Sequence, residues 1–481
     1  MLAGHFYARR AFTKFSYMSL PLKPPNGGDT RPFIKGRTVT SVFRATKQGP
    51  HYRPGNVRTT MLLLRMVYQV IINLYGLLKL RKFYKERNKN KPANEDISVI
   101  FYSDNLDEVN GIANSLRSVV PYLRSKGKKA QLWGSAFHTR TNGVIENSFV
   151  VLFPRAASME QLGYADSELA FPQLAPVLRF LKHYPANILE LETPSPGAWL
   201  VWLAARVAGL KVVSHYRTDV PSYTRFLVKE AWMRRYVLNY MRIFYQNTTP
   251  VISPCETYRE ILETEIKVKP ELIKVLPRGI PLENFSPDYR KLPQTQQKRK
   301  VRFLYVGRIS VEKNISFLEV LWEEFCKKYP ELAANAELTF VGGGWYLETL
   351  IKNMLDYSNV YFVGVRTGKE LAELYANADF FLFPSGSDTF GNVVVESLAS
   401  GTPVLVTDKG GPQDIIKNAE EKCGWVLPFE NLDEWENQLG KCCEMFGTPE
   451  YQDMRKHSVI HSQNYTLEKM TNALWEFFKK L

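Results

Sequence analysis

Two acidic residues, Asp388 and Glu396, lie eight positions apart in the segment whose residue types best suit ligand chemistry. The apolar run 380–383 before them predicts a short buried strand, and 393–398 predicts a helix that ends near Gly401. The small-residue loop between them would present backbone N–H groups and the positive end of the helix dipole. Such a loop can hold a diphosphate, while the two acids reach different ends of one ligand. The alternative is that one acid only caps the helix and the other is solvated.

A second segment supplies cations. Residues 302–306 predict a strand that runs into a turn at Gly307, and Arg308 and Lys313 follow that turn. Guanidinium and ammonium groups are the side chains that pair with phosphates in proteins. The two segments together therefore predict a site for a phosphorylated ligand.

The segment 387–404 resembles the signature of the retaining glycosyltransferases of family 4, which have two facing Rossmann-like domains in the arrangement called GT-B. That signature reads roughly S-[DE]-T-F-G-N-V-V-x-E-A-x-A-x-G-x-P-V. Asp388 stands where glutamate is commoner, a variant found in the branch that makes glycolipids, sulfolipids and phosphatidylinositol mannosides. Further segments match family motifs in the same order along the chain: 104–112 (D-x-x-x-P-x-V-N-G-V without its proline), 214–221 (S-x-H-T-D-x-P with Arg217 inserted), 277–287 (P-N-G-V-D…F-x-P) and 306–314 (V-G-R-x-x-x-E-K-N).

The resemblance implies transfer of a hexose, with retention, from a nucleotide-diphosphate-sugar that acts as co-substrate. It implies that Arg308 and Lys313 neutralise the diphosphate as it leaves. It also implies that Asp388 holds the sugar hydroxyls together with the backbone N–H groups of Phe390, Gly391 and Asn392. No carboxylate pair is an obvious nucleophile and acid, so we expect a front-face mechanism with a short-lived oxocarbenium ion.

The resemblance implies roles at four other positions. Glu396 would bind the ribose hydroxyls, and Val365 would contact the base. Gly111 would let a loop of the first domain approach the donor phosphate without a Cβ in the way. His215 would lie near the transferred sugar. The implied catalytic residues are His215, Arg308, Lys313 and Asp388.

The rest of the chain predicts an α/β protein with two Rossmann-like domains. Its 481 residues are too many for one ordinary domain, and a hydrophobic content of 45 % is typical of globular proteins. Apolar runs alternate with helical patterns, which indicates parallel sheets covered on both faces, with ligands outside the carboxyl ends of the strands. The expected strands are 97–101, 149–153, 188–191 and 212–213 in a first sheet, and 303–306, 338–341, 360–363, 380–383 and 404–406 in a second.

The polar stretch 291–300 has the composition of a linker. We therefore expect a basic N-terminal extension over 1–95 and a Rossmann-like acceptor domain over 96–290. A nucleotide-sugar-binding domain would follow over 298–462. The last part, 463–481, would be a helix that packs back on the acceptor domain.

Other types of site are not predicted. Glycines 342–344 follow an expected strand but do not form G-x-G-x-x-G, and the chain has no P-loop pattern. The five cysteines lack C-x-x-C spacing, which argues against structural zinc and for a reducing compartment. Neither H-E-x-x-H nor D-x-D occurs. We therefore expect no metal, and no cofactor beyond the nucleotide-sugar co-substrate.

Positive charge is concentrated at the start of the chain. Residues 1–85 contain 16 Lys or Arg and a single acid, Asp29, for a net charge of +15 that equals the net charge of the whole chain. Each basic residue near an anionic membrane contributes roughly 1 kcal/mol before screening. The distribution favours an anionic membrane surface as partner over nucleic acid.

Residues 61–80 are the most apolar window of this extension. Arg65, Gln69 and Asn73 recur every four residues and would form one polar stripe on a helix. Such a stripe disfavours a transmembrane span, so we expect a helix that lies in the membrane interface. A cleaved organelle-targeting segment within 1–60 is the alternative.

A second basic and aromatic stretch, 223–244, lies inside the first domain. It is either an ordinary surface helix with buried aromatic residues or a surface that docks on anionic lipid. Two cationic elements favour a lipid acceptor, and hence a glycolipid-forming hexosyltransferase, peripheral or monotopic, on the cytoplasmic side of a membrane. The alternatives are transfer to a cell-wall or lipid-linked glycan, and a catalytically silent sugar-nucleotide-binding protein.

Overall fold

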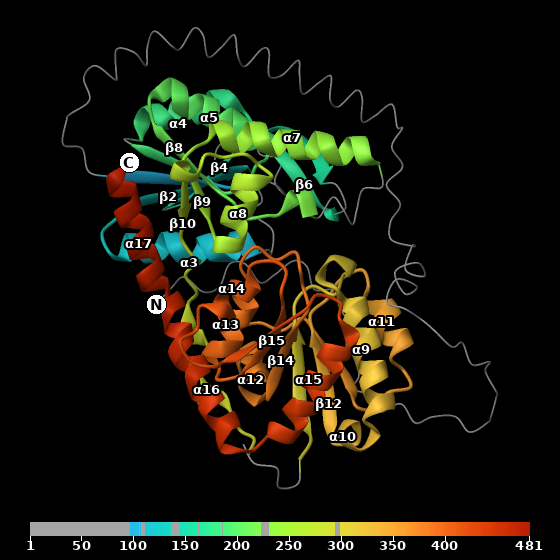
Figure 1. The fold of residues 1–481 in the computed structure, drawn as a ribbon. Coiled ribbons are helices and arrows are strands. Elements are labelled where there is room, and N and C mark those ends of the chain that lie inside the picture. The colour runs from blue at the N-terminus through green and yellow to red at the C-terminus, as the bar shows by residue number, and fades with distance from the viewer. Residues whose placement is uncertain are drawn as a thin grey trace. The chain divides into compact units, whose positions relative to one another are not determined.

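The computed structural model describes residues 97–104, 106, 111–135, 145–147, 149–161, 164–184, 186–222, 230–293 and 299–481. The predicted basic extension and its interface helix over 61–80 lie outside the described residues, and so do 223–229 and the linker residues 294–298. The described chain forms two large sheets with helices packed on them, and one small antiparallel sheet (Figure 1). Within these described ranges, no helix is both long enough and apolar enough to span a bilayer.

The first sheet has eight strands in the order β10-β9-β8-β7-β1-β2-β4-β3. Neighbouring strands are parallel except for β3 and β4, which are antiparallel. The strands are β1 Ser98–Tyr102, β2 Lys129–Ser135, β3 Ile145–Asn147, β4 Val150–Phe153, β7 Ile188–Leu191, β8 Lys211–His215, β9 Val251–Ser253 and β10 Ile273–Val275. The small sheet is a pair formed by β5 Arg155–Gln161 and β6 Tyr164–Pro172.

Alternate residues of β1 enter two different cores, because successive side chains of a strand point to opposite faces. Val99 and Phe101 join one core with helices α3 and α17, whereas Ile100 and Tyr102 join the other with α4, α5, α7 and α8. Helices therefore cover both faces of the first sheet. Their bounds are α3 Gly111–Ser125, α4 Leu174–His183, α5 Pro196–Ala208, α7 Ala231–Asn247, α8 Glu256–Thr264 and α17 Leu467–Lys480.

The last helix of the chain, α17, packs against the first sheet. Phe478 meets Phe101 edge to face with ring centroids 6.2 Å apart. The ammonium of Lys128 lies 5.5 Å from the ring centroid of Trp475 on the same helix. The core on this face of the first sheet is therefore built from segments that lie far apart in the sequence.

The second sheet has six strands, all parallel, in the order β13-β12-β11-β14-β15-β16. The strands are β11 Val301–Val306, β12 Ala336–Val341, β13 Val360–Gly364, β14 Phe380–Phe383, β15 Val404–Thr407 and β16 Gly424–Leu427. The helices of this part are α9 Ile315–Lys328, α10 Pro330–Ala334, α11 Leu347–Asn353, α12 Gly368–Asn377, α13 Asn392–Ala399, α14 Pro412–Lys417, α15 Leu432–Met445 and α16 Pro449–Ser462. Short 3-10 turns lie at η1 Pro270–Leu272, η2 Leu282–Asn284, η3 Pro287–Tyr289, η4 Val311–Lys313 and η5 Gln463–Tyr465.

A buried carboxylate anchors both ends of the linker to the second sheet. Asp379 Oδ1 accepts hydrogen bonds from Arg290 Nη2 at 2.6 Å and from Arg299 Nη2 at 2.7 Å. Tyr451 donates its hydroxyl to the same oxygen, and the N–H of Arg302 binds the other oxygen. Burial alone would raise the pKa of Asp379, but the two arginines hold it below its ordinary value. Asp379 is therefore ionised in the folded protein, and the two guanidinium groups balance its negative charge.

Replacing Asp379 with alanine should lower the free energy of unfolding by about 3–5 kcal/mol, because two buried guanidinium groups would lose their partner. Chemical denaturation followed by circular dichroism measures this. The control is Glu373→Ala, which removes the partner of the exposed Lys291 and should leave the midpoint almost unchanged. An unaltered midpoint in Asp379→Ala would contradict the anchoring role.

Candidate functional site

The loop between β14 and α13 has the strand–loop–helix geometry that the sequence predicts. Gly391 precedes the first residue of α13 with φ 99°, and a Cβ built on it would lie only 2.9 Å from Pro412 Cγ. A glycine is therefore required for the chain to enter the helix here. Among the described residues, no side chain caps the first turn of α13. The N–H groups of that turn thus have no side-chain acceptor.

Lys313 and Asp388 form an ion pair at the carboxyl ends of β11 and β14. The ammonium of Lys313 lies 2.7 Å from Oδ1 and 2.8 Å from Oδ2 of Asp388, and Ser385 donates its hydroxyl to the same carboxylate. The two side chains are only 13 % and 23 % exposed. The sequence assigned the two residues to different parts of one ligand, and the structure places them in direct contact.

Arg308 lies in the loop that follows β11. Its side chain is 42 % exposed, and its Nη1 lies 3.7 Å from Oε1 of the buried Glu312. Two glycines fix this loop against the next one: a Cβ on Gly342 would lie 1.9 Å from the carbonyl oxygen of Gly307, and a Cβ on Gly344 would lie 2.2 Å from that of Ile309. The glycine run that the sequence excluded as a dinucleotide motif therefore positions the loop that carries Arg308.

Glu396 is partly buried on α13, where its Oε2 accepts a hydrogen bond from the hydroxyl of Tyr375 at 3.0 Å. Burial raises the pKa of Glu396 to about 7, and the bond from Tyr375 offsets only part of that shift. Since a carboxylate with such a pKa is only half ionised near neutrality, a ligand that donates hydrogen bonds to it would favour the charged form.

The other predicted donor residues differ in what they offer a ligand. Val365, directly after β13, is 66 % exposed. The side chain of Phe390 is buried against the ring of Tyr465, with centroids 5.7 Å apart, so only its backbone can take the predicted part. The Oδ1 atom of Asn392, at the start of α13, is buried without a hydrogen bond to any described residue.

The donor loop also contacts the segment that follows β8. Thr389 donates its hydroxyl to the carbonyl oxygen of Arg217 at 2.7 Å. The guanidinium of Arg278 donates to the same carbonyl at 3.1 Å and to the hydroxyl of Thr389 at 3.3 Å. Arg217, which is an insertion relative to the family motif, thus bonds to the donor loop through its main chain. The sequence did not single out Thr389 or Arg278 for this contact.

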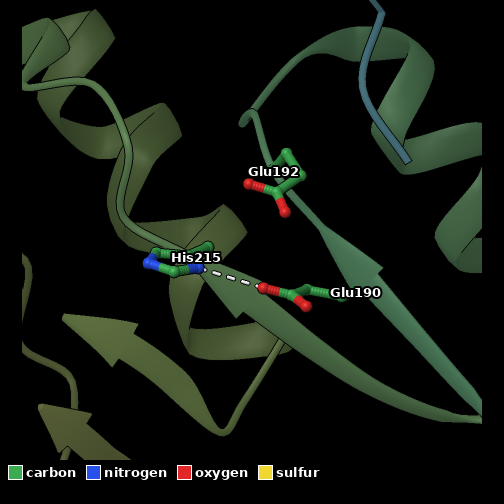
Figure 2. Close-up of side chains that lie close together, drawn as sticks. All are labelled: Glu190, Glu192 and His215. Atoms are coloured by element: carbon green, nitrogen blue, oxygen red, sulfur yellow. Dashed lines mark hydrogen bonds and ion pairs between the residues drawn. The ribbon is translucent and has the colours of Figure 1, made fainter. Parts of the chain in front are cut away.

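Two predicted residues belong to the first sheet. His215 is the last residue of β8 and is buried, with Nδ1 3.0 Å from Oε1 of Glu190 on β7 (Figure 2). Gly111 is the first residue of α3, is exposed, and has no atom within 4 Å of a Cβ built on it. Its predicted approach to a donor phosphate stays a prediction.

Glu190, Glu192 and His215 are buried together, with potential metal-ligating atoms all within 4.8 Å of one another. Both carboxylate oxygens of Glu192, however, accept hydrogen bonds from the guanidinium of Arg217. A cation already compensates this carboxylate, which makes the set a poor metal site. The expectation that no metal takes part stays a prediction. In the sequence, the two glutamates of the apolar run I-L-E-L-E at 188–192 are an unused signal for this cluster.

Two family sequence models match the chain. The model described as Glycosyltransferase Family 4 matches residues 109–284, and the model described as Glycosyl transferases group 1 matches residues 289–458. The chain belongs to glycosyltransferase family 4. The resemblance inferred from the motifs is thereby confirmed. One model covers the strands of the first sheet other than β1, and the other covers all strands of the second sheet.

Several curated relatives of this glycosyltransferase have names that denote sugar transfer or glycolipid synthesis. It is 29 % identical over 319 residues to the alpha-monoglucosyldiacylglycerol synthase of Streptococcus pneumoniae, covering 64 % of this chain and 70 % of the relative. It is 25 % identical to the sulfoquinovosyl transferase SQD2 of Arabidopsis thaliana, covering 69 % of this chain but only 63 % of that relative. A GDP-mannose-dependent alpha-mannosyltransferase of Mycobacterium tuberculosis is 27 % identical, covering 77 % of this chain and 89 % of the relative.

Solved glycosyltransferase structures share the fold. Sucrose-phosphate synthase from Thermosynechococcus elongatus matches with a TM-score of 0.62 and 19 % identity, over 80 % of this chain and 98 % of that one. Anabaena Alr3699/HepE in complex with UDP and glucose matches with a TM-score of 0.59 and 18 % identity, over 80 % of this chain and the full length of the other. The predicted fold class, α/β with two Rossmann-like domains in the GT-B arrangement, is confirmed.

Replacing Glu396 with glutamine should stabilise the ligand-free protein at pH 8. The fold favours the protonated acid, so wild-type stability falls as the pH rises from the ordinary glutamate pKa to about 7, and the full penalty applies above that value. Glutamine has no such penalty and can still accept the bond from Tyr375. We expect a gain of roughly 1–3 kcal/mol at pH 8 that shrinks toward pH 5.

Thermal unfolding of both proteins across this pH range measures the difference. Glu348→Gln, which neutralises an exposed carboxylate on α11, controls for the loss of one charge. A Glu396→Gln variant that is no more stable than the wild type at pH 8 would show that Glu396 carries no burial penalty.

Proposed function

We propose that this glycosyltransferase transfers a hexose, with retention of anomeric configuration, from a nucleotide-sugar to a lipid acceptor at a membrane surface. The observation that carries the donor half of the proposal is the ion pair of Lys313 and Asp388 beside the uncapped first turn of α13. An ammonium has three donor hydrogens, so Lys313 can keep Asp388 and also bind a phosphate oxygen. The exposed Arg308 is a second cation for the same diphosphate.

The remaining donor groups fit the other parts of a nucleotide-sugar. Asp388, turned by its bond to Lys313, would accept hydroxyls of the sugar, with backbone N–H groups of Gly391 and Asn392 nearby in the same loop. Glu396 would accept the ribose hydroxyls in its ionised form. The exposed side chain of Val365 offers an apolar contact for the base. A solved structure of the same fold, Anabaena Alr3699/HepE, contains UDP and glucose.

The proposed reaction is a displacement on the front face of the sugar without a metal. The bond between the anomeric carbon and the diphosphate oxygen breaks first, which leaves a short-lived oxocarbenium ion. The acceptor hydroxyl then attacks from the same face, and its proton passes to the departing diphosphate. Lys313 and Arg308 stabilise the negative charge that develops on that leaving group.

Replacing Lys313 with alanine should lower turnover by about 100- to 1000-fold, the usual effect of removing a group that stabilises transition-state charge. Transfer from a panel of nucleotide-sugars, with the product anomer assigned by NMR, measures both rate and stereochemistry. Lys327→Ala is the control, because Lys327 is an exposed lysine paired with Glu323 on α9.

The outcomes separate the proposal from its alternatives. Near-normal turnover in Lys313→Ala would refute the donor assignment. A wild-type protein that is stabilised by a nucleotide-sugar but neither hydrolyses nor transfers it would favour the catalytically silent protein. An inverted product would refute retention.

The acceptor half of the proposal rests on the relatives and on helix α7. One of the relatives is named as a synthase of the glycolipid alpha-monoglucosyldiacylglycerol, and another as a sulfoquinovosyl transferase. On α7, large apolar side chains at Trp232, Tyr236 and Ile243 are 66 %, 64 % and 56 % exposed. Their spacing places them along one side of the helix, with the exposed Arg235 between them. Aromatic and cationic side chains on one helix face are typical of binding to anionic membrane interfaces.

The same helix also buries Met241, Phe244 and Tyr245 in the core. The described part of the stretch 223–244 is therefore packed into the core near its end and exposes aromatic side chains near its start. This surface and the predicted extension over 1–95 would together bring the acceptor domain to the lipid.

The double variant Trp232→Ser/Tyr236→Ser should bind vesicles of phosphatidylcholine with anionic lipid several-fold more weakly than the wild type, because two interfacial side chains are lost. Vesicle flotation measures bound protein. The matched control is Ile460→Ser on α16, where Ile460 is 68 % exposed. Equal flotation of all three proteins would contradict a membrane role for this face of α7.

A further inference from the structure

A carboxylate lies buried inside a central strand of the first sheet. Glu190 belongs to β7, which pairs with β1 on one side and β8 on the other, and its side chain is fully buried. Its strand neighbours Leu189 and Leu191 belong to the hydrophobic core. Since burying a carboxylate is costly unless it is paired, an apolar residue would serve stability here at least as well. The glutamate therefore calls for a reason other than stability.

Glu190 on β7 and Glu192, one residue beyond that strand, form two adjacent rungs with His215 at the end of β8 and with Arg217, two residues beyond β8. Side chains two apart in an extended chain share a face, and both segments use this period. In the first rung, Glu190 Oε1 lies 3.0 Å from His215 Nδ1. In the second, Glu192 accepts hydrogen bonds from Nε and Nη2 of Arg217. Figure 2 shows the carboxylate of Glu190 pointing toward the His215 ring, with the dashed hydrogen bond between them, and Glu192 above this pair.

The two rungs leave one nitrogen of the imidazole for another partner. Arg217 takes both oxygens of Glu192, so Glu190 is the carboxylate that holds His215. Among the described residues, His215 Nε2 and Glu190 Oε2 are buried and accept or donate no hydrogen bond. A ring that is held at Nδ1 presents Nε2 in a fixed direction. A sugar hydroxyl, which both donates and accepts, can pair with Nε2 in either tautomer.

The surroundings keep this ring uncharged. Burial lowers the pKa of His215 well below its ordinary value, and the charges of Arg217 and Arg278 lower it further. Burial and the charge of Glu192 raise the pKa of Glu190. The pair is therefore not a carboxylate with an imidazolium. A neutral ring does not repel the positive charge that develops on a sugar as its bond to a diphosphate breaks, whereas an imidazolium would.

We propose that Glu190 is a positioning residue that holds His215 by Nδ1, so that Nε2 of a neutral imidazole meets a hydroxyl of the transferred sugar. The ion pair with Glu192 fixes Arg217, two residues after His215. The carbonyl oxygen of Arg217 in turn accepts a hydrogen bond from Thr389 in the donor loop. This inference rests on the proposed hexose transfer with His215 beside the sugar.

The test compares three substitutions of Glu190. Glu190→Leu removes the bond to Nδ1 and suits the apolar strand. Glu190→Asp keeps the carboxylate but draws it back by one methylene. Glu190→Gln keeps the length and can still pair with Nδ1. We expect kcat to fall about 10- to 100-fold in the first two, as for other residues that orient a functional histidine. The KM for the nucleotide-sugar should change less, and Glu190→Gln should retain most of the activity.

A double-mutant cycle with His215→Ala shows whether Glu190 acts through the imidazole. We expect Glu190→Leu to lower kcat in the wild type and to have no further effect in His215→Ala. An equal loss in both backgrounds would overturn the positioning role while the proposed function stands. If His215→Ala itself leaves turnover unchanged, the role of His215 and this inference are both overturned, whereas the Lys313→Ala result still decides the donor site.

Melting temperature and metal content distinguish positioning by Glu190 from a role in stability or in metal binding. Glu190→Leu should melt close to the wild type, because relief of the buried carboxylate offsets the loss of the partner of His215 Nδ1. If Glu190→Leu melts lower, the double-mutant cycle with His215→Ala is carried out with Glu190→Asp instead. A normal kcat in Glu190→Asp would then overturn the proposal. Elemental analysis of the purified proteins measures bound metal. A stoichiometric divalent metal that is present in the wild type and absent from His215→Ala would also overturn the positioning role in favour of a metal site.

Discussion

The partly buried ion pair between Lys313 and Asp388 is the interaction on which the donor side of this glycosyltransferase depends. It joins the loops after β11 and β14, two neighbouring strands of one sheet. Each charge makes the other tolerable in a site that water reaches poorly. The cation is thus held in place before any ligand arrives, and preorganised charge of this kind stabilises leaving groups without further rearrangement. The glycines at 342 and 344 let the loop after β12 pack closely on the loop after β11, which carries Arg308 as well as Lys313.

Both halves of the enzyme solve the same problem, which is to keep polar groups at the carboxyl edge of a parallel sheet. The second sheet does so with Lys313 and Asp388, and the first with the two rungs that Glu190 and Glu192 form. The main chain of Arg217 connects the two sets by accepting the hydroxyl of Thr389. The guanidinium of Arg278 adds a second link, because it donates to that carbonyl and to the hydroxyl of Thr389.

Much of the fold was readable in the sequence because buried parallel strands are apolar runs. Strands 188–191 and 380–383 were predicted with their observed bounds, and the two domains and the family followed from motifs. The pairing of side chains across strands was not readable. Which of two nearby glutamates holds His215, and that Lys313 contacts Asp388, depend on strand order and register rather than on local residue types. The glycines 342–344 were discounted because they do not form a dinucleotide motif, and their packing against the loop at Gly307 depends on a segment distant in the sequence.

The packing of α17 on the first sheet affects the order in which the two sheets can fold during synthesis. Its Trp475 and Phe478 complete a core that begins at Val99 and Phe101, although the entire second sheet is synthesised between them. While the protein emerges from a ribosome, α3 can cover only its own part of this face of the first sheet, and the part under α17 stays exposed until that helix is released. The second sheet has all its strands in one continuous segment and can fold first. An apolar surface that is exposed during synthesis favours aggregation, so slow completion of α17 would lower the yield of folded protein.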